Sequence, residues 1–454
     1  MSELSAKIWP KSAKIENGSL EIGGCSAIDL VAKYGSPIFI LDEADLRTRA
    51  IDWKVQLSAA FGANSGSVIY AGKAFLSVEI AKIIEELGLA LDVCTGGELA
   101  VARAAKFPAE RLEMHGNNKS ELEISEALDY GVAKIVVDSV SEIERVARLA
   151  KERKKVQEIL IRLTPGVEAH THEYISTAHE DVKFGFSIAS GAAWEAVTEI
   201  AKHESLRLMG VHAHIGSQIF NEEAFVETAT RLIGFMGRFA KEYKRELREL
   251  NLGGGFGIAY TESDNPISAE KMLSSICKIV ATESTNAGIA IPRVSIEPGR
   301  AIIGPSMVTL YTVGTTKEVE LENGDTRLYV AVDGGMSDNI RTALYGADYI
   351  TILANRGSNS GLRNCRVVGK HCESGDILIK EIALPSDISP GDLLAIPATG
   401  AYGRSMASNY NHVPRPGVIS VSNGTARTII RSETAADLLA LDISEPARPI
   451  REQK

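Results

Sequence analysis

The sequence has few cysteines, and none of them stand in the close pairs that mark zinc or redox sites. Its 454 residues contain only five, namely Cys25, Cys94, Cys277, Cys365 and Cys372. Without a Cys-x-x-Cys pair, a structural zinc module and a disulfide framework are both disfavoured. We therefore expect free thiols in a reducing compartment, the cytoplasm.

Long hydrophobic runs and excess positive charge are missing too. No apolar stretch is long enough to span a bilayer, and the first residues lack the basic and apolar regions of a signal peptide. The net charge is −10 at pH 7, whereas binding to a phosphate backbone needs a basic face. We therefore expect neither a membrane nor a nucleic acid as partner. The 44% hydrophobic content is that of an ordinary globular protein.

From Ser67 onward, short apolar strands alternate with amphipathic helical segments. The strands are predicted at 67–71, 90–94, 112–115, 134–138, 159–163, 208–214, 249–252 and 293–297. Helices are predicted between them, for example at 78–87, 97–105, 139–151 and 222–241. Because parallel strands need such crossover connections, the alternation predicts a parallel sheet.

Eight strand–helix units match a closed (β/α)8 barrel of the TIM type, with an open, doubly wound sheet as the alternative. We prefer the barrel because polar or charged residues follow nearly every strand, and barrel active sites collect residues from the C-terminal ends of many strands. These residues are Lys73, Asp92, His115, Asp138, Arg162, His214, the glycines of 253–257 and Glu297.

After about residue 304 the pattern changes to short strands and turns. Segments 317–321 and 326–332 flank Asn323-Gly324, a strong hairpin signal, and further strands are predicted at 365–368, 376–379 and 392–396. The N-terminal stretch has strand character at 37–41. We predict three parts: an N-terminal segment that packs with the β-rich domain, the barrel, and the C-terminal β-rich domain. Their bounds are 1–42, 43–303 and 304–454.

Lys73 follows the first predicted barrel strand directly. Its ammonium is costly to bury without a partner, so one interpretation is a lysine that extends from the strand end to water. The chemical interpretation is a desolvated amine that loses its proton readily and forms an imine with an aldehyde.

The turns after the seventh and eighth strands carry residues suited to an anionic ligand. Glycines in 253–257 would let backbone N–H groups approach a phosphate, although a tight structural turn would explain them as well. Glu297 and Arg300 share one turn and could simply pair with each other. Alternatively, Glu297 pairs with a ring nitrogen and Arg300 with an anion of the ligand.

Histidines end the sixth predicted strand. His212 and His214 share one strand face and could bind a metal, as could His170 and His172. No third and fourth ligands stand at zinc-site spacing. We therefore expect no metal, a planar cofactor stacked on His214, and His212 as a satisfied barrel residue.

Two segments of the β-rich region carry further chemistry. Cys372 and Glu373 lie between glycines, in either a plain turn with an inert thiol or a site of proton transfer. Arg341 and Tyr345 stand four residues apart. They either take part in a surface salt bridge or present a guanidinium fork and a hydroxyl to a carboxylate.

Together these segments resemble the diaminopimelate decarboxylase family of fold-type III pyridoxal-phosphate enzymes, from about residue 34 to residue 416. The motifs that carry the resemblance are 70–75, 92–99, 115–120, 165–172, 214–218, 253–257, 297–300, 333–345 and 370–376. It implies a barrel that binds pyridoxal 5′-phosphate and a β-domain that completes the site. It also implies a homodimer in which the cysteine loop reaches the site of the neighbouring subunit. Thr164, Cys94 and Thr95 depart from the common family residues, at positions without an assigned role.

The resemblance further implies a reaction and a role for each matching residue. The reaction is decarboxylation of meso-2,6-diaminopimelate to L-lysine and carbon dioxide, the last step of lysine biosynthesis. Lys73 resembles the Schiff-base lysine, Glu297 the acid at the ring nitrogen, and Cys372 the proton donor to the carbanion. The implied cofactor contacts are Asp92, His214, Ser217, Gly254, Gly255, Gly257, Glu297, Gly299, Arg300 and Tyr402. The implied substrate contacts are Arg300, Arg341, Tyr345, Glu373 and Tyr402.

Three alternatives stay open. A decarboxylase of the same fold type for ornithine, arginine or carboxynorspermidine would give Arg341 less to bind. A racemase is disfavoured by Glu297, because an arginine at the ring nitrogen would suit that reaction better. A non-catalytic inhibitor with this fold is disfavoured by the presence of Lys73 and Cys372.

Overall fold

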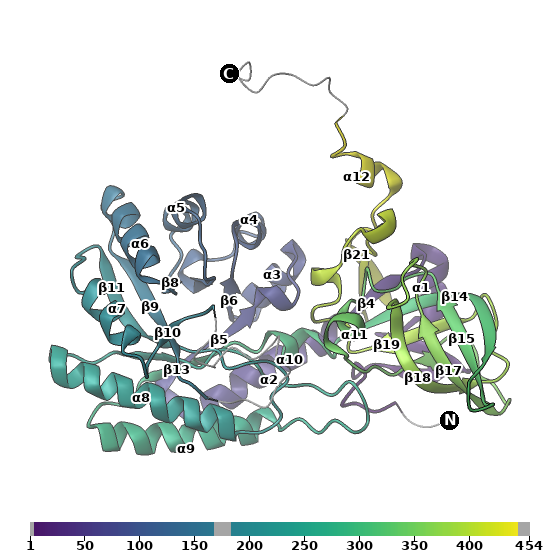
Figure 1. The fold of residues 1–454 in the computed structure, drawn as a ribbon, viewed down its shortest axis with the longest axis horizontal. Coiled ribbons are helices and arrows are strands. Elements are labelled where there is room, and N and C mark those ends of the chain that lie inside the picture. Colours follow the sequence, from purple (N-terminus) through teal and green to yellow (C-terminus); the bar gives the residue numbers. More distant parts are fainter. Residues whose placement is uncertain (1–3, 168–182, 444–454) are drawn as a thin grey trace.

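The structure is a computed structural model that describes residues 4–167 and 183–443. Figure 1 shows two bodies side by side, a barrel wrapped by helices on the left and a β-rich domain on the right. None of the helices in these two ranges is both long and apolar enough to cross a bilayer. The predictions at His170 and His172 lie outside the described residues.

Within the described ranges, eight parallel strands close into a barrel, because neighbouring strands pair in order and the last of them, β13, pairs with β5. The strands are β5 (Ser65–Ala71), β6 (Ala90–Val93), β7 (Leu112–Met114), β8 (Lys134–Val137), β9 (Gln157–Thr164), β11 (Leu206–His212), β12 (Glu249–Asn251) and β13 (Arg293–Ile296). A short strand, β10 (Phe186–Ser187), adds to β9. The predicted closed barrel is confirmed, and the open sheet is wrong.

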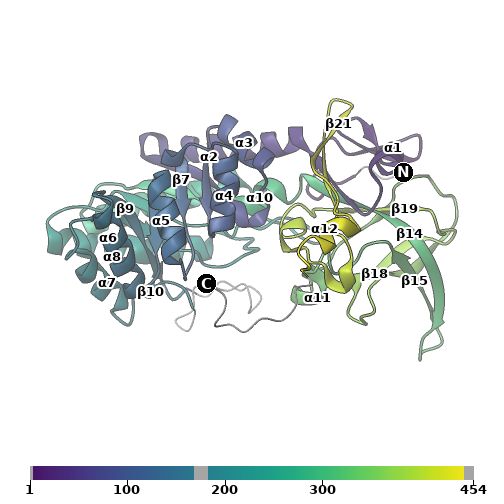
Figure 2. The same cartoon turned by 90° about the horizontal axis from the view of Figure 1, so that it is seen from above.

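Helices cover the outside of the barrel (Figure 2). They are α2 (Glu43–Phe61), α3 (Val78–Glu86), α4 (Gly96–Ala104), α5 (Glu121–Tyr130), α6 (Val140–Glu152), α7 (Ala192–Ile200), α8 (Glu223–Tyr243) and α9 (Ala269–Ala287), whereas the short, buried α10 (Gly299–Ile303) follows β13. The local sequence explains where several begin. Ser77, Thr95, Ser120, Ser139 and Ser268 each accept a hydrogen bond from a backbone N–H three residues further on. Such caps satisfy N–H groups that the first helical turn leaves without a partner.

The β-rich domain is built around one mixed sheet in the order β18-β17-β15-β14-β4-β20-β21, with β19 also on β14 and β16 on β19. Its strands are β4 (Ile38–Asp42), β14 (Met307–Glu320), β15 (Thr326–Val332), β16 (Ile352–Leu353), β17 (Leu362–Val368), β18 (Ile377–Pro385), β19 (Leu393–Pro397), β20 (Val418–Ser422) and β21 (Thr425–Ile430). A small sheet contains β1 (Lys14–Glu16), β2 (Ser19–Ile22) and β3 (Cys25–Ser26), and the helices are α1 (Ala27–Tyr34), α11 (Arg341–Tyr345) and α12 (Ala435–Leu439). Single 3-10 turns are η1 (Gly62–Asn64), η2 (Gly72–Ala74), η3 (Ala109–Arg111), η5 (Arg404–Met406) and η6 (Tyr410–His412).

Two sequence predictions about this domain are confirmed. The Asn323-Gly324 turn joins β14 to β15 in an antiparallel hairpin, and Gly324 has a φ of +83°. The N-terminal segment joins the sheet, because β4 pairs with β14 on one side and with β20 on the other. The chain then passes directly from β4 into α2 of the barrel.

Candidate active site

Several of the groups predicted at the strand ends line one cavity, namely Lys73, His214, Gly254, Gly255 and Glu297, whereas Asp92, His115, Asp138 and Arg162 do not. It is lined by Ala71, Lys73, His214, Ser217, Gly254, Gly255, Phe256, Glu297, Pro298, Gly299, Arg300 and Tyr402. Asp92 and Gly257 were predicted to contact the cofactor, but they are not among these lining residues. The cavity lies at the C-terminal ends of the strands, where barrel enzymes carry their active sites.

Lys73 lies in η2, immediately after β5. Burial opposes its charged form, but the phenol of Tyr402 and the carboxylates of Asp92 and Glu297 raise the pKa of Lys73 above its ordinary value. The expectation that this lysine loses its proton readily was therefore wrong for the protein alone, because acidic groups surround the amine. The chain's own residues favour the ammonium form.

Asp92 interacts electrostatically with Lys73 but does not form part of the cavity wall. It is buried at the end of β6, and Sγ of Cys94 donates a hydrogen bond to its Oδ1 over 3.4 Å. Burial and the charge of Glu297 raise the pKa of Asp92 well above its ordinary value.

Glu297 follows β13 and is buried among three polar groups. Nδ2 of Asn251 donates a hydrogen bond to its Oε1 at 2.9 Å, and Nε2 of His212 and of His115 lie 3.2 and 3.4 Å from the same oxygen. Burial raises the pKa of Glu297, but the two histidines and Lys73 outweigh it and hold this pKa well below its ordinary value. Burial lowers the pKa of both histidines. Glu297 is therefore a carboxylate in close contact with both imidazoles.

This group corrects two interpretations of the sequence. His212 is not a fully satisfied barrel residue, because its Nδ1 has no partner within the described residues and its Nε2 lies 3.2 Å from Oε1 of Glu297 without hydrogen-bond geometry. His115, His212 and Glu297 bring their ligand atoms within 4.8 Å of one another, although their spacing along the chain gives no sign of it. Glu297 and Arg300 also do not pair with each other, since each contacts other side chains.

The glycine loop after β12 packs tightly against a neighbouring strand end. Gly255 has a φ of +114°, and a Cβ there would lie 2.7 Å from the carbonyl oxygen of Gly216. The Gly254 N–H donates a hydrogen bond to Nδ1 of His214 at 3.2 Å, which assigns the proton of a neutral ring to Nε2. Burial, followed by the charge of Lys73, lowers the pKa of His214 well below its ordinary value.

Arg300, in the barrel, contacts Tyr402 of the β-rich domain, which forms one wall of the cavity. Its Nη2 donates to Oγ of Ser217 at 2.7 Å and its Nη1 to the hydroxyl of Tyr260 at 2.5 Å. The guanidinium lies 4.6 Å from the ring centre of Tyr402. Tyr402 is held there by its backbone N–H, which donates to the carbonyl of Ala74 at 2.9 Å. The β-rich domain therefore closes one side of the cavity.

Arg341 begins α11 and is buried. Its Nη1 donates to the hydroxyl of Tyr349 at 2.5 Å, and its guanidinium lies over the ring of Tyr260. Burial opposes its charge, but the two tyrosines raise the pKa of Arg341 above its ordinary value. Within residues 4–167 and 183–443, neither Arg341 nor Arg300 forms an ion pair with an acidic side chain. The surface salt bridge considered for Arg341 is therefore wrong.

The remaining predicted residues lie in the β-rich domain. Tyr345 ends α11, one helical turn from Arg341, and is half-buried. Cys372 and Glu373 are exposed in the loop between β17 and β18, which Asp376 fastens by accepting hydrogen bonds from two backbone N–H groups. Within one chain, neither Cys372 nor Glu373 lines the cavity of Lys73.

Sequence reasoning missed Asn251, Tyr260 and Tyr349. Asn251 stands two residues before the glycine loop, and Tyr349 stands four residues after Tyr345. Their closeness to predicted motifs was the only sign in the sequence that Asn251 and Tyr349 belong to the site. Tyr260 had none, because its contacts with the two arginines join segments far apart in the sequence.

The donor set fits pyridoxal phosphate. Lys73 offers an amine for the aldehyde, Glu297 a carboxylate for the ring nitrogen, and His214 a neutral ring for one face. The glycine loop, which a Cβ would obstruct, and Arg300 suit the anionic part of the ligand. A closed (β/α)8 barrel with these groups at its C-terminal strand ends defines a pyridoxal-phosphate-dependent enzyme.

Comparison with known proteins narrows this class. Residues 43–304 match the family described as "Pyridoxal-dependent decarboxylase, pyridoxal binding domain". Diaminopimelate decarboxylase of Mycobacterium tuberculosis (strain ATCC 25618 / H37Rv) is 50% identical over 445 residues, which are 97% of this chain and 98% of that protein. The Bacillus subtilis (strain 168) enzyme is 46% identical, with 95% and 97% covered. The diaminopimelate decarboxylase structure from M. jannaschii in complex with L-lysine matches with a TM-score of 0.89 at 30% identity, covering 96% of this chain and 99% of that one. The chain belongs to the diaminopimelate decarboxylase family.

Proposed function

We propose that this enzyme decarboxylates meso-diaminopimelate to L-lysine and carbon dioxide. The observation that carries the proposal is the pair of buried arginines, Arg300 and Arg341, without an acidic partner in the described residues. An unpaired buried charge is costly, so an anionic group of the substrate is expected there. Arg300 lines the cavity of Lys73, and both guanidinium groups contact Tyr260. A substrate with a second carboxylate meets this requirement.

The barrel residues bind and orient the cofactor. Bound pyridoxal phosphate supplies the electron sink for the electrons released when carbon dioxide leaves. Lys73 attaches the cofactor through its amine, and His214 covers one face of the ring. Glu297, which is held as a carboxylate, keeps a proton on the ring nitrogen through charge pairing. The proposed contacts of the phosphate are Ser217, Gly254, Gly255, Gly257, Gly299 and Tyr402.

Four side chains bind the substrate at the end that is distal to the reacting α-carbon. Arg300, Arg341 and Tyr345 hold the distal carboxylate, and Glu373 recognises the distal amino group. Bidentate guanidinium–carboxylate contacts fix geometry as well as charge, which supports discrimination against amino acids that have only one carboxylate.

A second copy of the chain completes the site. Cys372 is exposed in a loop that the carboxylate of Asp376 holds by a hydrogen bond, and it does not line the cavity of its own chain. In a homodimer with shared sites, Cys372 from one chain delivers a proton to the α-carbon of a substrate bound by the other. General acids of this kind need to lie within hydrogen-bond reach of the atom that they protonate.

The proposal also covers the cellular compartment of the enzyme and the domain boundaries of the chain. All five cysteines are free, which supports a reducing cytoplasm. We divide the chain into 1–42, 43–303 and 304–454, so that the barrel holds the cofactor and the β-rich domain completes the site.

The test is release of carbon dioxide and L-lysine from purified protein supplied with pyridoxal phosphate. meso-Diaminopimelate is run beside ornithine, arginine and carboxynorspermidine. Lysine from diaminopimelate alone is the expected result. Activity on ornithine or arginine alone would keep the cofactor site and overturn the roles of Arg341 and Glu373.

A further inference from the structure

Three side chains of the barrel interior contact the carboxylate of Glu297, all on the same oxygen. The hydrogen bond from Asn251 and the close contacts of His115 and His212 all fall on Oε1. Glu297 also lines the cavity that receives the cofactor. Its two oxygens therefore have different surroundings, because these three contacts all fall on Oε1.

Asn251 is locked by three hydrogen bonds. One N–H of its amide donates to Oε1 of Glu297, and Nδ2 also donates to Oε2 of Glu113 at 3.2 Å. Its Oδ1 accepts the backbone N–H of Gly253 at 2.9 Å. The side chain is 1% exposed. One amide thus connects the acid of the cavity to the first residue of the glycine loop.

Glu113 is in turn fixed from the opposite end of the barrel. Nζ of Lys134 lies 3.0 Å from Glu113 and 2.9 Å from Glu249. The Lys134 ammonium pairs with the Glu113 carboxylate. Glu113, the second carboxylate that Asn251 contacts, is therefore charge-compensated inside the barrel. The chain of contacts leads from Lys134 through Glu113 and Asn251 to Glu297.

We propose that Asn251, His115 and His212 are positioning residues that fix Oε1 of Glu297 and thereby present its Oε2 to the ring nitrogen of the cofactor. A ring proton on Nε2 of either histidine would direct its positive end at Oε1, as an electrostatic contact over 3.2 to 3.4 Å. The inference rests on the proposed role of Glu297, and it predicts that cofactor binding depends on side chains that do not line the cavity.

The first test is Asn251→Ala in the full-length protein freed of cofactor and titrated with pyridoxal phosphate. The dissociation constant should rise about tenfold, the size expected when a hydrogen bond to a charged group is lost. The visible absorption band of the bound cofactor should also shift, because ring protonation depends on Glu297.

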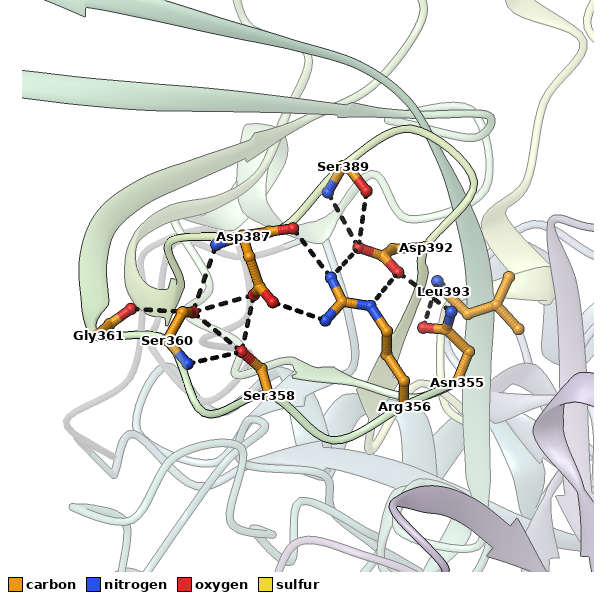
Figure 3. Close-up of polar contacts among 9 residues, drawn as sticks. All are labelled: Asn355, Arg356, Ser358, Ser360, Gly361, Asp387, Ser389, Asp392 and Leu393. Atoms are coloured by element: carbon orange, nitrogen blue, oxygen red, sulfur yellow. Dashed lines mark hydrogen bonds and ion pairs between the residues drawn. The ribbon is translucent and has the colours of Figure 1, made fainter.

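A matched control exists in the β-rich domain. Asn355 also bridges a carboxylate and a backbone N–H, since its Nδ2 donates to Asp392 and its Oδ1 accepts the N–H of Leu393 (Figure 3). Asn355→Ala removes the same kind of contact away from the barrel. It should lower thermal stability and leave the cofactor's dissociation constant and band unchanged.

The second test compares His212→Gln with His212→Leu. Glutamine keeps an N–H donor near the place of Nε2 and should bind the cofactor within about twofold of wild type, whereas leucine removes the donor and should weaken binding about tenfold. Equal binding by the two variants would overturn the role of His212. An unshifted band and unchanged affinity in a folded Asn251→Ala variant would overturn the role of Asn251.

Glu297→Gln separates this inference from the proposed function. If Glu297→Gln alters the band and Asn251→Ala and His212→Leu do not, the positioning inference fails and the role of Glu297 stands. If Glu297→Gln leaves the band unchanged, the role of Glu297 itself fails, whatever the product assay shows.

Discussion

The guanidinium of Arg341 lies 4.4 Å from the ring centre of Tyr260, so a residue of the β-rich domain meets a residue of the barrel. The same tyrosine accepts a hydrogen bond from Arg300. Stacking of a cation on an aromatic face is favourable and strengthens when the pair is desolvated. Two positive groups are thus held close together, which suits a site for a negatively charged substrate.

Replacing Arg341 should weaken substrate binding without harming the cofactor. Arg341→Ala removes a charge-assisted contact to the distal carboxylate, so we expect KM for meso-diaminopimelate to rise roughly tenfold to a hundredfold. The dissociation constant of pyridoxal phosphate should stay within about twofold of wild type. Arg363→Ala is the matched control, because Arg363 pairs with Glu318 on the surface of the same domain. Full activity of Arg341→Ala at low substrate would refute the assignment.

Lys73→Ala should abolish covalent attachment of the cofactor. The amine of Lys73 lines the cavity beside Glu297, and alanine cannot bond to an aldehyde. We expect loss of the visible absorption band of the bound cofactor and loss of lysine formation, with the circular dichroism spectrum retained. Lys11→Ala, in the N-terminal segment, serves as a lysine control. An unchanged band in Lys73→Ala would show that another amine holds the cofactor.

The barrel was predictable because its strands and helices leave local signals. Most strands contain a short apolar run, and several end one or two residues before a polar side chain, such as His115, Asp138 or Glu297. The charge state of Lys73 was not predictable. Its pKa depends on Tyr402, which is supplied by the other domain and far along the chain.

Contacts inside the barrel were not predictable either. Asn251 reaches Glu113 across 138 positions of sequence and Glu297 across 46. Such pairs arise from strand register in a closed barrel, and no local periodicity encodes them. The exposure of Cys372 in one chain likewise follows from tertiary structure, whereas the sequence motif alone suggested only that a thiol and a carboxylate are neighbours.

Asp338 predicts a pH dependence of stability. It is buried in the loop before Arg341 and accepts hydrogen bonds from the hydroxyl of Tyr311 and the N–H of Gly335. Burial raises the pKa of Asp338 from 3.8 to about 7. Between these two values the folded protein keeps the proton and the unfolded chain releases it. This group's contribution to stability is therefore complete at low pH and is lost as the pH rises to about 7.

Asp338→Asn should remove this pH dependence. The amide has nearly the shape of the acid; its oxygen can accept from the N–H of Gly335, and its NH2 group can donate to the hydroxyl of Tyr311. We expect the variant to be more stable relative to wild type at pH 8 than at pH 5, so the free energy of unfolding of the variant minus that of wild type should be larger at pH 8. Urea unfolding at the two pH values measures it. A difference that does not change with pH would contradict the raised pKa of Asp338.

Cys372→Ala should separate cofactor binding from turnover. The thiol lies outside the cavity of its own chain, so the absorption band and affinity of pyridoxal phosphate should be unchanged. Loss of a positioned general acid should lower kcat by roughly a hundredfold or more. Cys25→Ala, at a half-buried thiol in the small N-terminal sheet, is the control. Near-normal lysine formation by Cys372→Ala would remove it as the proton donor.

Mixing two inactive variants tests whether the site is shared between chains. In a dimer of one Lys73→Ala chain and one Cys372→Ala chain, one site has lost both groups and the other keeps both, provided that the two groups come from different chains. Random re-pairing of equal amounts should then restore about a quarter of the wild-type activity, since about half of the dimers are mixed and each holds one intact site of two. If both groups came from the same chain, every site would lack one of them and the mixture would stay inactive. Recovery of activity therefore supports a homodimer in which the exposed Cys372 loop serves the neighbouring barrel, and its absence in a mixture shown to exchange chains would refute the shared site.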